Sequence, residues 1–391
     1  MNLILFDGNL RQHLLPFTYT RPLAEIRLGI LTIREKWEKH LETKASYYSP
    51  NYLADKFKLK IEADNIIING ALCPNMRLLS KIVELKKGEG LYKDDVLLAA
   101  RLNGEDVVEY DKSVKVQKQF EHDVNLVDRM WKIFLYNKNE LERDFELVTA
   151  GRTSANLSST NTIIGDQIFV EEGVEAEAAI INAATGPVYL GKNSTVLEGT
   201  AIRNGLSLGE GPVLKMGAKI YGATTIGPDC KVGGEVHNSV LFGHSNKGHD
   251  GYLGNSVLGE WCNLGADTNT SNLKNNYDQV KLWSYIRGGF ERTGEQFCGL
   301  MMGDHSKCGI NTMFNTGTVV GVSANIYGAG FPRNFIPSFS WGGPQGMQEY
   351  SLSKALQTAK IVMSRRNIEL DEVETNILTH VFEASKDYRN F

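Results

Sequence analysis

The sequence has no excess of basic residues, no long apolar run and no closely spaced cysteine pair. Its formal net charge is −4, whereas a nucleic-acid-binding surface normally shows a basic excess. No apolar stretch reaches the ~18 residues that span a bilayer, and the N-terminus does not have the pattern of a signal peptide. The five cysteines include no CxxC pair and are odd in number, which favours free thiols. We expect a cytoplasmic protein that binds neither nucleic acid nor membrane.

What the sequence does contain is an apolar residue at every sixth position over much of its second half. The positions are Leu190, Val196, Ile202, Leu208, Leu214, Ile220, Ile226 and Val232, then Leu258 and Leu264, then Met302, Cys308, Phe314, Val320 and Ile326. A period of six fits neither a helix nor a two-layer sheet. It is typical of a parallel β-helix, in which stacked coils bury one apolar column.

Glycine often follows the apolar position directly, as in Gly191, Gly209 and Gly227. We expect these glycines at the corners of the coils, where the backbone bends into positive φ or approaches its neighbour closely. A β-sandwich of short strands with Gly-rich turns is the alternative. Its strands would recur at irregular spacings of about 8–12 residues.

The first 150 residues show a different pattern, in which strands alternate with helices. Strands are predicted at Leu3–Phe6, Asn65–Ile68 and Val96–Arg101, and a helix at Ala24–Leu41, which indicates an α/β architecture. Helical patterns return at 120–148 and at 352–382. The predicted domains are therefore an α/β domain at 1–150, a β-helix at 151–335 and a helical tail at 336–391.

The N-terminal segment resembles the start of sugar nucleotidyltransferases. Leu15-Pro16-Phe17-Thr18 and Arg21-Pro22-Leu23 match the second half of that family's phosphate-loop pattern. The resemblance implies that Gly8, Arg11 and Arg21 bind a nucleotide. Gly8 is the only glycine of the loop, however, and Ala71 stands where the family has a Mg²⁺-binding carboxylate.

Three interpretations of this domain remain open at the level of the sequence. It is a degenerate domain kept as a scaffold or substrate-binding module, a divergent but working nucleotidyltransferase, or an α/β domain by coincidence. Mg²⁺ is expected as a cofactor only if the domain is active.

The six-residue period is interrupted between Glu235 and Gly254, where three of the eight histidines lie close together. Loops that project from a rigid scaffold often carry catalytic groups. His237, His244 and His249 could also suggest a metal site, as in the γ-class carbonic anhydrases, which have the same repeat. The ligand spacing of that family is not met, and we predict no metal here.

The sequence around this interruption resembles the acetyltransferase domain of the GlmU family. Members of that family are bifunctional enzymes that act as N-acetylglucosamine-1-phosphate uridylyltransferase and as glucosamine-1-phosphate acetyltransferase. The matching residues, in order, are Gly248-His249, Tyr252, Gly254, Asn263, Gly265-Ala266, Thr268, Thr270 and Asn272. The resemblance implies a left-handed β-helix and a homotrimer with each active site between subunits.

The resemblance also implies the roles of individual residues. His249 would be the general base, since imidazole titrates near neutral pH, and Glu235 the carboxylate that orients it. Residues implied at the acceptor sugar are Lys219, His237, Lys247, Tyr252, Asn263 and Asn272. Residues implied at acyl-CoA are Ala266, Thr268 and Arg287, the last because positive charge there suits a diphosphate.

The leading hypothesis is an enzyme that transfers an acyl group, specifically acetyl from acetyl-CoA, to an amino group of a sugar phosphate or nucleotide sugar. His237 and Lys219 stand where the family has Lys and Arg, so the acceptor need not be glucosamine-1-phosphate. The alternatives are a bifunctional enzyme that also makes the nucleotide sugar and a non-catalytic sugar-nucleotide-binding protein.

Overall fold

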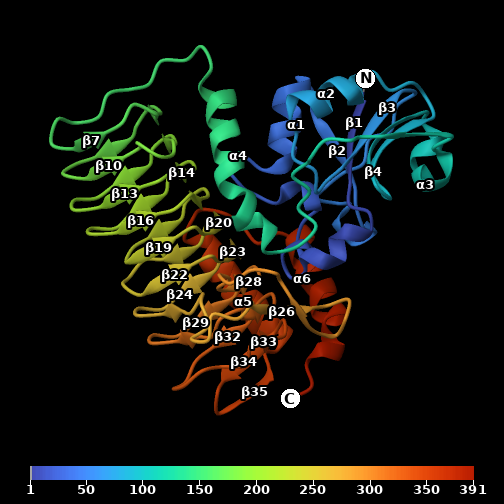
Figure 1. The fold of residues 1–391 in the computed structure, drawn as a ribbon. Helices are drawn as coiled ribbons and strands as arrows, with labels where there is room; N and C mark the ends of the chain where they lie inside the picture. The colour runs from blue at the N-terminus through green and yellow to red at the C-terminus, as the bar shows by residue number, and fades with distance from the viewer. Residues whose placement is uncertain (1) are drawn as a thin grey trace. The chain divides into compact units, whose positions relative to one another are not determined.

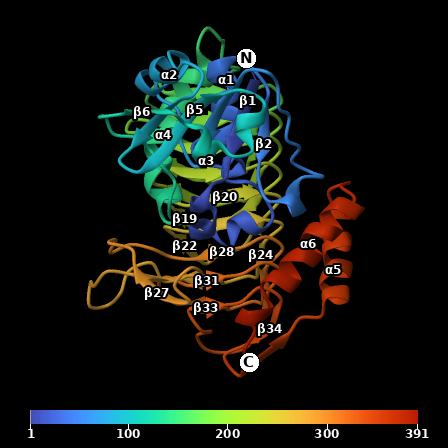
Figure 2. The ribbon, with the colours of Figure 1, turned by 90° about the vertical axis from the view of Figure 1, so that its right-hand side faces the viewer.

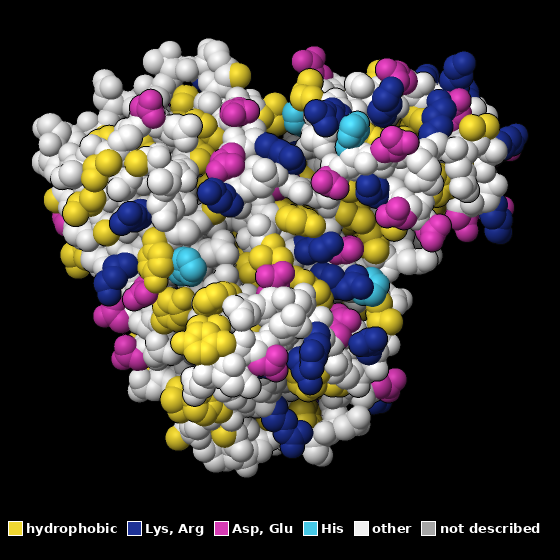
Figure 3. Space-filling view, viewed as in Figure 1, with side chains coloured by type: hydrophobic (Ala, Val, Ile, Leu, Met, Phe, Trp, Pro, Cys, Tyr) yellow, Lys and Arg dark blue, Asp and Glu magenta, His cyan; other side chains and the backbone are white. Residues whose placement is uncertain are grey.

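The computed structural model describes residues 2–391, which fold into two units. The first unit comprises Met1–Leu14, Thr20–Ile26 and Leu31–Arg129; the second comprises Leu15–Tyr19, Arg27–Ile30 and Met130–Phe391. Figure 1 colours the chain from its N-terminus to its C-terminus, so that each unit can be followed. On the face seen in Figure 3, acidic and basic side chains are interspersed with hydrophobic ones.

The first unit is built on one mixed sheet with the strand order β2-β1-β3-β5-β4-β6. Its strands are β1 (Asn2–Phe6), β2 (Ala45–Tyr48), β3 (Asn65–Asn69), β4 (Glu89–Lys93), β5 (Val96–Leu102) and β6 (Val116–Gln119). β1 pairs in parallel with β2 and β3, whereas β5 is antiparallel to both β3 and β4. β1 and β3 are buried along their whole length, as their unbroken apolar runs indicate.

The helices of this unit are α1 (Ile33–Leu41), α2 (Met76–Val83) and α3 (Tyr110–Ser113), with short 3₁₀ turns at Asn9–Leu14, Leu23–Glu25, Asn51–Leu53 and Glu105–Val107. The helix predicted at Ala24–Leu41 is wrong in its first part, because α1 begins only after Thr32. The Thr32 side chain accepts from the Glu35 backbone N–H while the Glu35 carboxylate accepts from the Thr32 N–H, a capping box that fixes the start.

The second unit is dominated by a parallel β-helix with three flat faces, which the chain visits in turn (Figure 1). The first face contains β7 (Thr162–Ile164), β10 (Ile180–Asn182), β13 (Ala201–Arg203), β16 (Lys219–Tyr221), β19 (Glu235–His237) and β22 (Tyr252–Gly254). The second contains β8 (Ile168–Val170), β11 (Val188–Leu190), β14 (Leu206–Leu208), β17 (Thr224–Ile226), β20 (Val240–Gly243), β23 (Val257–Glu260), β28 (Met301–Met302), β31 (Val319–Val320) and β33 (Phe335–Ile336).

The third face contains β9 (Glu175–Ala176), β12 (Thr195–Val196), β15 (Val213–Leu214), β18 (Lys231–Val232), β21 (Asn246–Lys247), β24 (Asn263–Leu264), β29 (Lys307–Cys308), β32 (Asn325–Ile326), β34 (Ser340–Gly343) and β35 (Gly346–Glu349). A short parallel pair, β25 (Asn269–Thr270) with β30 (Met313–Phe314), forms a separate two-stranded sheet next to β22. β34 and β35 close the stack as an antiparallel hairpin.

The apolar residues of the six-residue period form the interior of this helix. Leu190, Leu208 and Ile226 are register partners on successive strands, eighteen residues apart, so one coil consists of three six-residue segments. Every position of the period named above belongs to one buried cluster. The predicted fold class is confirmed: an α/β unit is followed by a parallel β-helix and C-terminal helices.

The glycines after the apolar positions serve a purpose that differs in part from the prediction. Gly191, Gly209 and Gly227 do not have positive φ. A Cβ at Gly227 would instead collide with the backbone carbonyl of Phe242 on the next coil. Close approach between coils, rather than a left-handed backbone, is therefore the reason for glycine here.

The interruption of the period has a structural cause. The step from Lys231 to its partner Asn246 is fifteen residues instead of eighteen, and the next step, to Asn263, is seventeen. A longer excursion follows, in which the antiparallel hairpin of β26 (Lys281–Ser284) and β27 (Gly289–Arg292) projects from the coils (Figure 2).

Three further helices belong to the second unit: α4 (Lys132–Thr149), α5 (Leu352–Ser364) and α6 (Glu372–Ala384), with a last 3₁₀ turn at Lys386–Tyr388. α4 is fixed to the second face by Asn137, whose amide donates to the Ala223 carbonyl at 2.7 Å and accepts from the Thr225 hydroxyl at 2.9 Å. α5 and α6 lie side by side (Figure 2). Within residues 2–391, no helix is both long and apolar enough to cross a membrane.

Candidate active site

The loop between β21 and β22 carries the histidine predicted to be the general base. β21 belongs to the third face and β22 to the first, so the loop turns the corner between these two faces. His249 lies on this loop with an exposed side chain, and that side chain makes no hydrogen bond to the rest of residues 2–391. Its imidazole is therefore available to a substrate.

A pocket of about 620 Å³ opens beside this loop. His249, Asn263 and Ala266 all line it, although the first lies on the β21–β22 loop and the others on the next coil. Asn263 is the register partner of Asn246, another lining residue, so both amides face outward from the third face. The pocket therefore contains the predicted general base (His249), one residue predicted to contact the acceptor sugar (Asn263) and one predicted to contact acyl-CoA (Ala266).

The pocket is strongly basic. Its basic side chains are Lys215, Lys231, Lys307, Arg365 and Arg366. The positive charge of Arg366, followed by burial and by Lys215, lowers the pKa of Lys231 below its usual value. Burial lowers the pKa of Lys307 to about 8. Cations held so close to one another favour an anionic ligand.

Two of these cations, Arg365 and Arg366, directly follow α5, in the segment that the sequence predicts only as a helical tail. The Arg366 guanidinium donates to the backbone carbonyl of Asp229 at 3.2 Å and to the Asn246 side-chain oxygen at 3.1 Å. Sequence reasoning missed this set. A usable signal exists for Lys231 and Lys307, because each directly precedes an inward residue of the period and so must point outward.

Aromatic rings form another wall of the pocket. The rings of His244 and Trp261, on successive coils, stack with centroids 4.2 Å apart and an angle of 8° between their planes. The His244 Nδ1 lies 3.3 Å from an Asp229 carboxylate oxygen. Both rings stand on residues with positive φ, His244 at 53° and Trp261 at 62°, a conformation that bulky residues seldom adopt and that is often found at functional sites.

The outer side of the first face carries the other predicted polar residues. Lys219, Glu235 and Tyr252 are register partners on three successive strands and point outward together. Tyr221 and His237 form the adjacent column; their rings stack with centroids 4.7 Å apart. Burial lowers the pKa of His237, which favours the neutral imidazole.

Glu235 was predicted to orient the general base, and in the structure its carboxylate accepts a hydrogen bond from the Tyr221 hydroxyl at 2.6 Å. Burial, followed by this carboxylate, raises the pKa of Tyr221. The Tyr252 hydroxyl accepts from the Asn272 amide at 3.0 Å, and that amide also donates to Asn255 at 2.8 Å. The first face therefore presents a polar surface with two hydrogen-bonded groups, one at Glu235 and one at Tyr252.

Three predicted contact residues lie elsewhere. Lys247 is 2% exposed and points into the β-helix. Thr268 is 1% exposed, and its hydroxyl donates to the Gly265 carbonyl at 2.7 Å. Arg287 is exposed in the turn between β26 and β27 and is not among the residues of the basic pocket.

Arg11, which was predicted to bind a nucleotide, is held by contacts within the first unit. The Arg11 guanidinium pairs with the Asp7 carboxylate at 2.6 Å and also donates to the Arg21 carbonyl at 2.9 Å and to the Tyr52 hydroxyl at 2.7 Å. Asp7 accepts the Leu23 backbone N–H at 2.8 Å. An internal carboxylate thus neutralises the arginine that would otherwise meet a phosphate.

The position that corresponds to the Mg²⁺-binding carboxylate of the resembling family does not fit Mg²⁺. Ala71, two residues after the end of β3, is fully buried and its side chain is only a methyl group. In the described part of the chain, no group of three or more His, Cys, Asp or Glu side chains is arranged to hold a metal ion. A hard cation prefers carboxylate and carbonyl oxygens; the Ala71 side chain has none, and the Ala71 backbone carbonyl accepts the Val127 N–H at 2.8 Å.

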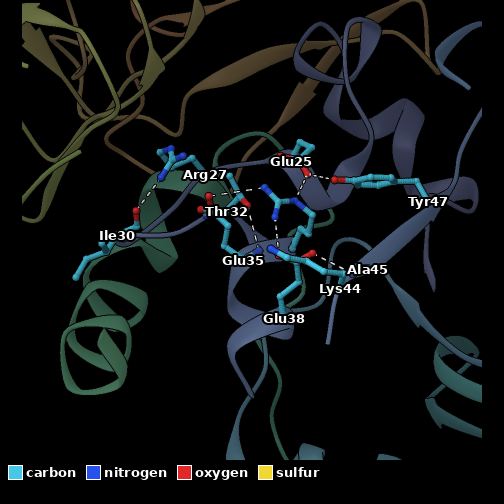
Figure 4. A network of polar contacts seen from close by, with 10 residues as sticks. Glu25, Arg27, Ile30, Thr32, Glu35, Glu38, Lys44, Ala45 and Tyr47 are labelled. Atoms are coloured by element: carbon cyan, nitrogen blue, oxygen red, sulfur yellow. Dashed lines mark hydrogen bonds and ion pairs between the residues drawn. The ribbon is translucent and has the colours of Figure 1, made fainter. Parts of the chain in front are cut away.

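A separate polar network lies around Arg34 in the first unit (Figure 4). Arg34 pairs with Glu25 at 2.6 Å and with Glu38 at 2.7 Å, and the Tyr47 hydroxyl donates to Glu25 at 2.5 Å. These contacts tie α1 to β2 and to the turn before α1. We assign these contacts a structural role, because they join neighbouring elements of the first unit.

Comparison with known proteins gives two kinds of similarity. The sequence model of the sugar nucleotidyl transferase family matches residues 3–153. The chain is 33% identical over 93 residues to the bifunctional sugar-1-phosphate nucleotidylyltransferase/acetyltransferase of Sulfurisphaera tokodaii, covering 24% of this chain and 23% of the relative. It is 25% identical over 210 residues to the bifunctional protein GlmU of Methanococcus vannielii, covering 49% and 43%.

Among solved structures, Arabidopsis UDP-N-acetylglucosamine acyltransferase matches at a TM-score of 0.26 and 16% identity, covering 60% of this chain and 91% of that one. A likeness this low supports no inference about the present chain. The chain spans less than half the length of the two curated relatives described above. The predicted resemblance is confirmed: residues 3–153 match the sugar nucleotidyl transferase model, and parts of the chain are similar to bifunctional proteins of the GlmU type.

Proposed function

We propose that the protein is a CoA-dependent acyltransferase that moves an acetyl group to the amino group of a sugar phosphate or nucleotide sugar. One observation carries the proposal: His249 stands on the corner between a basic pocket on one side and a polar surface on the other. The pocket suits the phosphates of an acyl-CoA. The first face, with the Lys219 ammonium group and a neutral His237 that can form hydrogen bonds, suits a sugar that bears an anionic group.

The chemistry follows from this arrangement. The acceptor nitrogen attacks the thioester carbonyl, and His249 takes the proton that the nitrogen loses. The C–N bond forms, the C–S bond breaks, and the sulfur leaves as the CoA thiol with the proton that His249 took from the nitrogen. The protein holds both reactants at one corner, which supplies the proximity that such a bimolecular reaction needs.

Within this proposal, Asn263 and Ala266 contact the reacting groups from the pocket, and Tyr252 and Asn272 contact the acceptor. Lys231, Lys307 and Arg366 replace Arg287 as the cations for the donor phosphates. A trimer with sites between subunits and a cytoplasmic location stay predictions from the sequence. The GlmU-type relatives support the activity by similarity over part of their length.

The deciding experiment measures thiol release from acetyl-CoA with a panel of amino sugar phosphates and amino nucleotide sugars. We expect one acceptor to be turned over, and His249→Ala to lower kcat by about 10²–10⁴-fold, the usual contribution of a general base. His122→Ala, an exposed histidine of the first unit, is the matched control. Full activity of His249→Ala would exclude the mechanism.

The match to a sugar nucleotidyl transferase model favours one second hypothesis, a bifunctional enzyme. The Asp7–Arg11 pair and the buried Ala71 argue against it, because Arg11 is paired with an internal carboxylate and Ala71 has no carboxylate for a metal. Release of pyrophosphate from a nucleoside triphosphate and a sugar-1-phosphate, with and without Mg²⁺, tests this activity. Magnesium-dependent release would establish it.

A further inference from the structure

One charged side chain lies in the apolar interior of the β-helix. Lys247 is in register with Val232, at the inward position of the third face, which Leu214, Leu264 and Cys308 occupy on other coils. Its side chain is 2% exposed. Burial lowers the pKa of this lysine to about 8, as expected for an ammonium group removed from water.

The ammonium group has a specific partner at the corner. Lys247 Nζ donates to the backbone carbonyl of His249 at 2.5 Å. The adjacent coil leaves room for this contact through Gly234, whose φ is +68°. A Cβ at Gly234 would lie 2.8 Å from both Nζ and the His249 carbonyl oxygen.

The rest of the loop is held by backbone hydrogen bonds to the coils on either side. Glu235 N–H donates to the Gly251 carbonyl at 3.2 Å, and Asp267 N–H donates to the Asp250 carbonyl at 3.1 Å. The His249 carbonyl is turned inward by Lys247, while the imidazole is exposed on the outside. The backbone that carries the imidazole is therefore fixed from both neighbouring coils and from within.

We propose that Lys247 is a positioning residue for the general base: its ammonium group holds the His249 carbonyl inside the β-helix and thereby aims the imidazole at the reacting amine. This inference rests on the proposed acyltransferase function. It gives Lys247 a different role from the sugar contact that the sequence resemblance implies, because a side chain that is 2% exposed does not reach a sugar on the outer surface.

The cost of this arrangement is an argument for function. An apolar residue at this position would continue the column of Val232 and Leu264 without desolvating a charge. A residue that breaks the local packing rule without improving stability is expected where function requires it.

The test compares Lys247→Met, which keeps the volume and removes the ammonium group, with the wild type in the thiol-release assay. We expect kcat to fall about 10- to 100-fold, the size of effect that a small misplacement of a catalytic group produces, while KM for both substrates changes less than about twofold. The thermal midpoint should be equal or higher. Leu214→Met, on the same inward column, is the control and should leave kcat and KM unchanged.

Lys247→Gln, which keeps a donor on a shorter stem, should recover part of the lost kcat. A Lys247→Met enzyme with kcat within about twofold of the wild type would overturn the inference, as would a loss of kcat that merely follows a lower thermal midpoint. Failure of the proposed function is distinguishable, because His249→Ala would then be fully active. Independently of activity, the ring signals of His249 in NMR spectra should change in Lys247→Met and stay unchanged in Leu214→Met.

Discussion

The coils from Leu190 to Val232 and the coils from Glu235 to Thr270 are built on the same repeat but differ in regularity. In the first set, every inward position of the period is apolar and each coil has eighteen residues. In the second, coils are shortened and an inward position holds Lys247. His249 and the residues of the basic pocket lie on or beside these irregular coils.

The difference indicates that the regular and the irregular coils have different roles in the same β-helix. Regular coils bury apolar surface and fix the register, so they supply stability. Irregular coils give up some of that stability and use the rigid neighbours to hold loops and charges in defined positions. Substitutions in the two sets should therefore have opposite effects on stability and activity.

The largest expected effect comes from the regular set. Leu208→Ala should lower the free energy of unfolding by about 2–5 kcal/mol, because it leaves a cavity at a fully buried position. Denaturant unfolding followed by circular dichroism measures this change. Met216→Ala, at a side chain that is 71% exposed, is the control and should change stability by less than about 0.5 kcal/mol. Equal effects of the two substitutions would contradict the assignment of the core.

The next effect is a gain in the free energy of unfolding, which we expect from replacing Lys247 and which depends on pH. Lys247 has a pKa of about 8 in the folded chain against an ordinary value of 10.5. Between these values the unfolded chain binds more protons, so the free energy of unfolding of the wild type rises with pH. Lys247→Met should therefore stabilise the protein by about 1–3 kcal/mol at pH 7, and by less at pH 10. Thermal midpoints at the two pH values test this, and a gain that grows with pH would contradict it.

The basic pocket joins the irregular coils to α5, and removing one of its cations should weaken binding more than catalysis. Arg366→Met should raise KM for acetyl-CoA about tenfold, or about 1.4 kcal/mol, with a smaller change in kcat. The effect should diminish at high salt. Lys360→Ala, an exposed lysine on the same helix, is the matched control. An unchanged KM in Arg366→Met would remove this pocket from the donor site.

The smallest expected effect is on the first face. Tyr221→Phe removes the hydroxyl that donates to Glu235 at 2.6 Å, and should lower the free energy of unfolding by about 0.5–1 kcal/mol. Tyr277→Phe, at a side chain that is 66% exposed, should have no measurable effect. The same denaturant measurements apply. A cost above about 2 kcal/mol would mean that the first face contributes as much to stability as a core position.

Much of the β-helix was predictable because its order repeats along the chain. One register, seen at Leu190 and Leu208, fixes which residues point inward on every regular coil. His249 was singled out by its sequence context, and the structure brings it to the pocket with Asn263 and Ala266. Local sequence patterns were sufficient to predict a candidate residue wherever that residue lies within or close to the six-residue repeat.

Two features were beyond the sequence for physical reasons. Lys247 occupies the inward position next to Val232 on the third face, but it follows Val232 by fifteen residues instead of eighteen. The six-residue period therefore does not predict that Lys247 points inward. Arg366 reaches Asn246 across a sequence separation of 120 residues, and no local pattern encodes such a contact. Long-range packing of α5 decides it.

The hairpin of β26 and β27 leaves the stack after Thr270 and returns before Met301, yet Val257 pairs directly with Met301 and Asn263 with Lys307. The parallel strand pairing of the second and third faces therefore continues without a gap across the inserted segment. Because the entropy of closing a loop grows only slowly with its length, residues added in the exposed turn between β26 and β27 should cost little, whereas Val280 and Leu282 at the base of the hairpin are fully buried. This corner is thus an entry point for new sequence, where evolution or an engineer can graft a recognition element without rebuilding the scaffold.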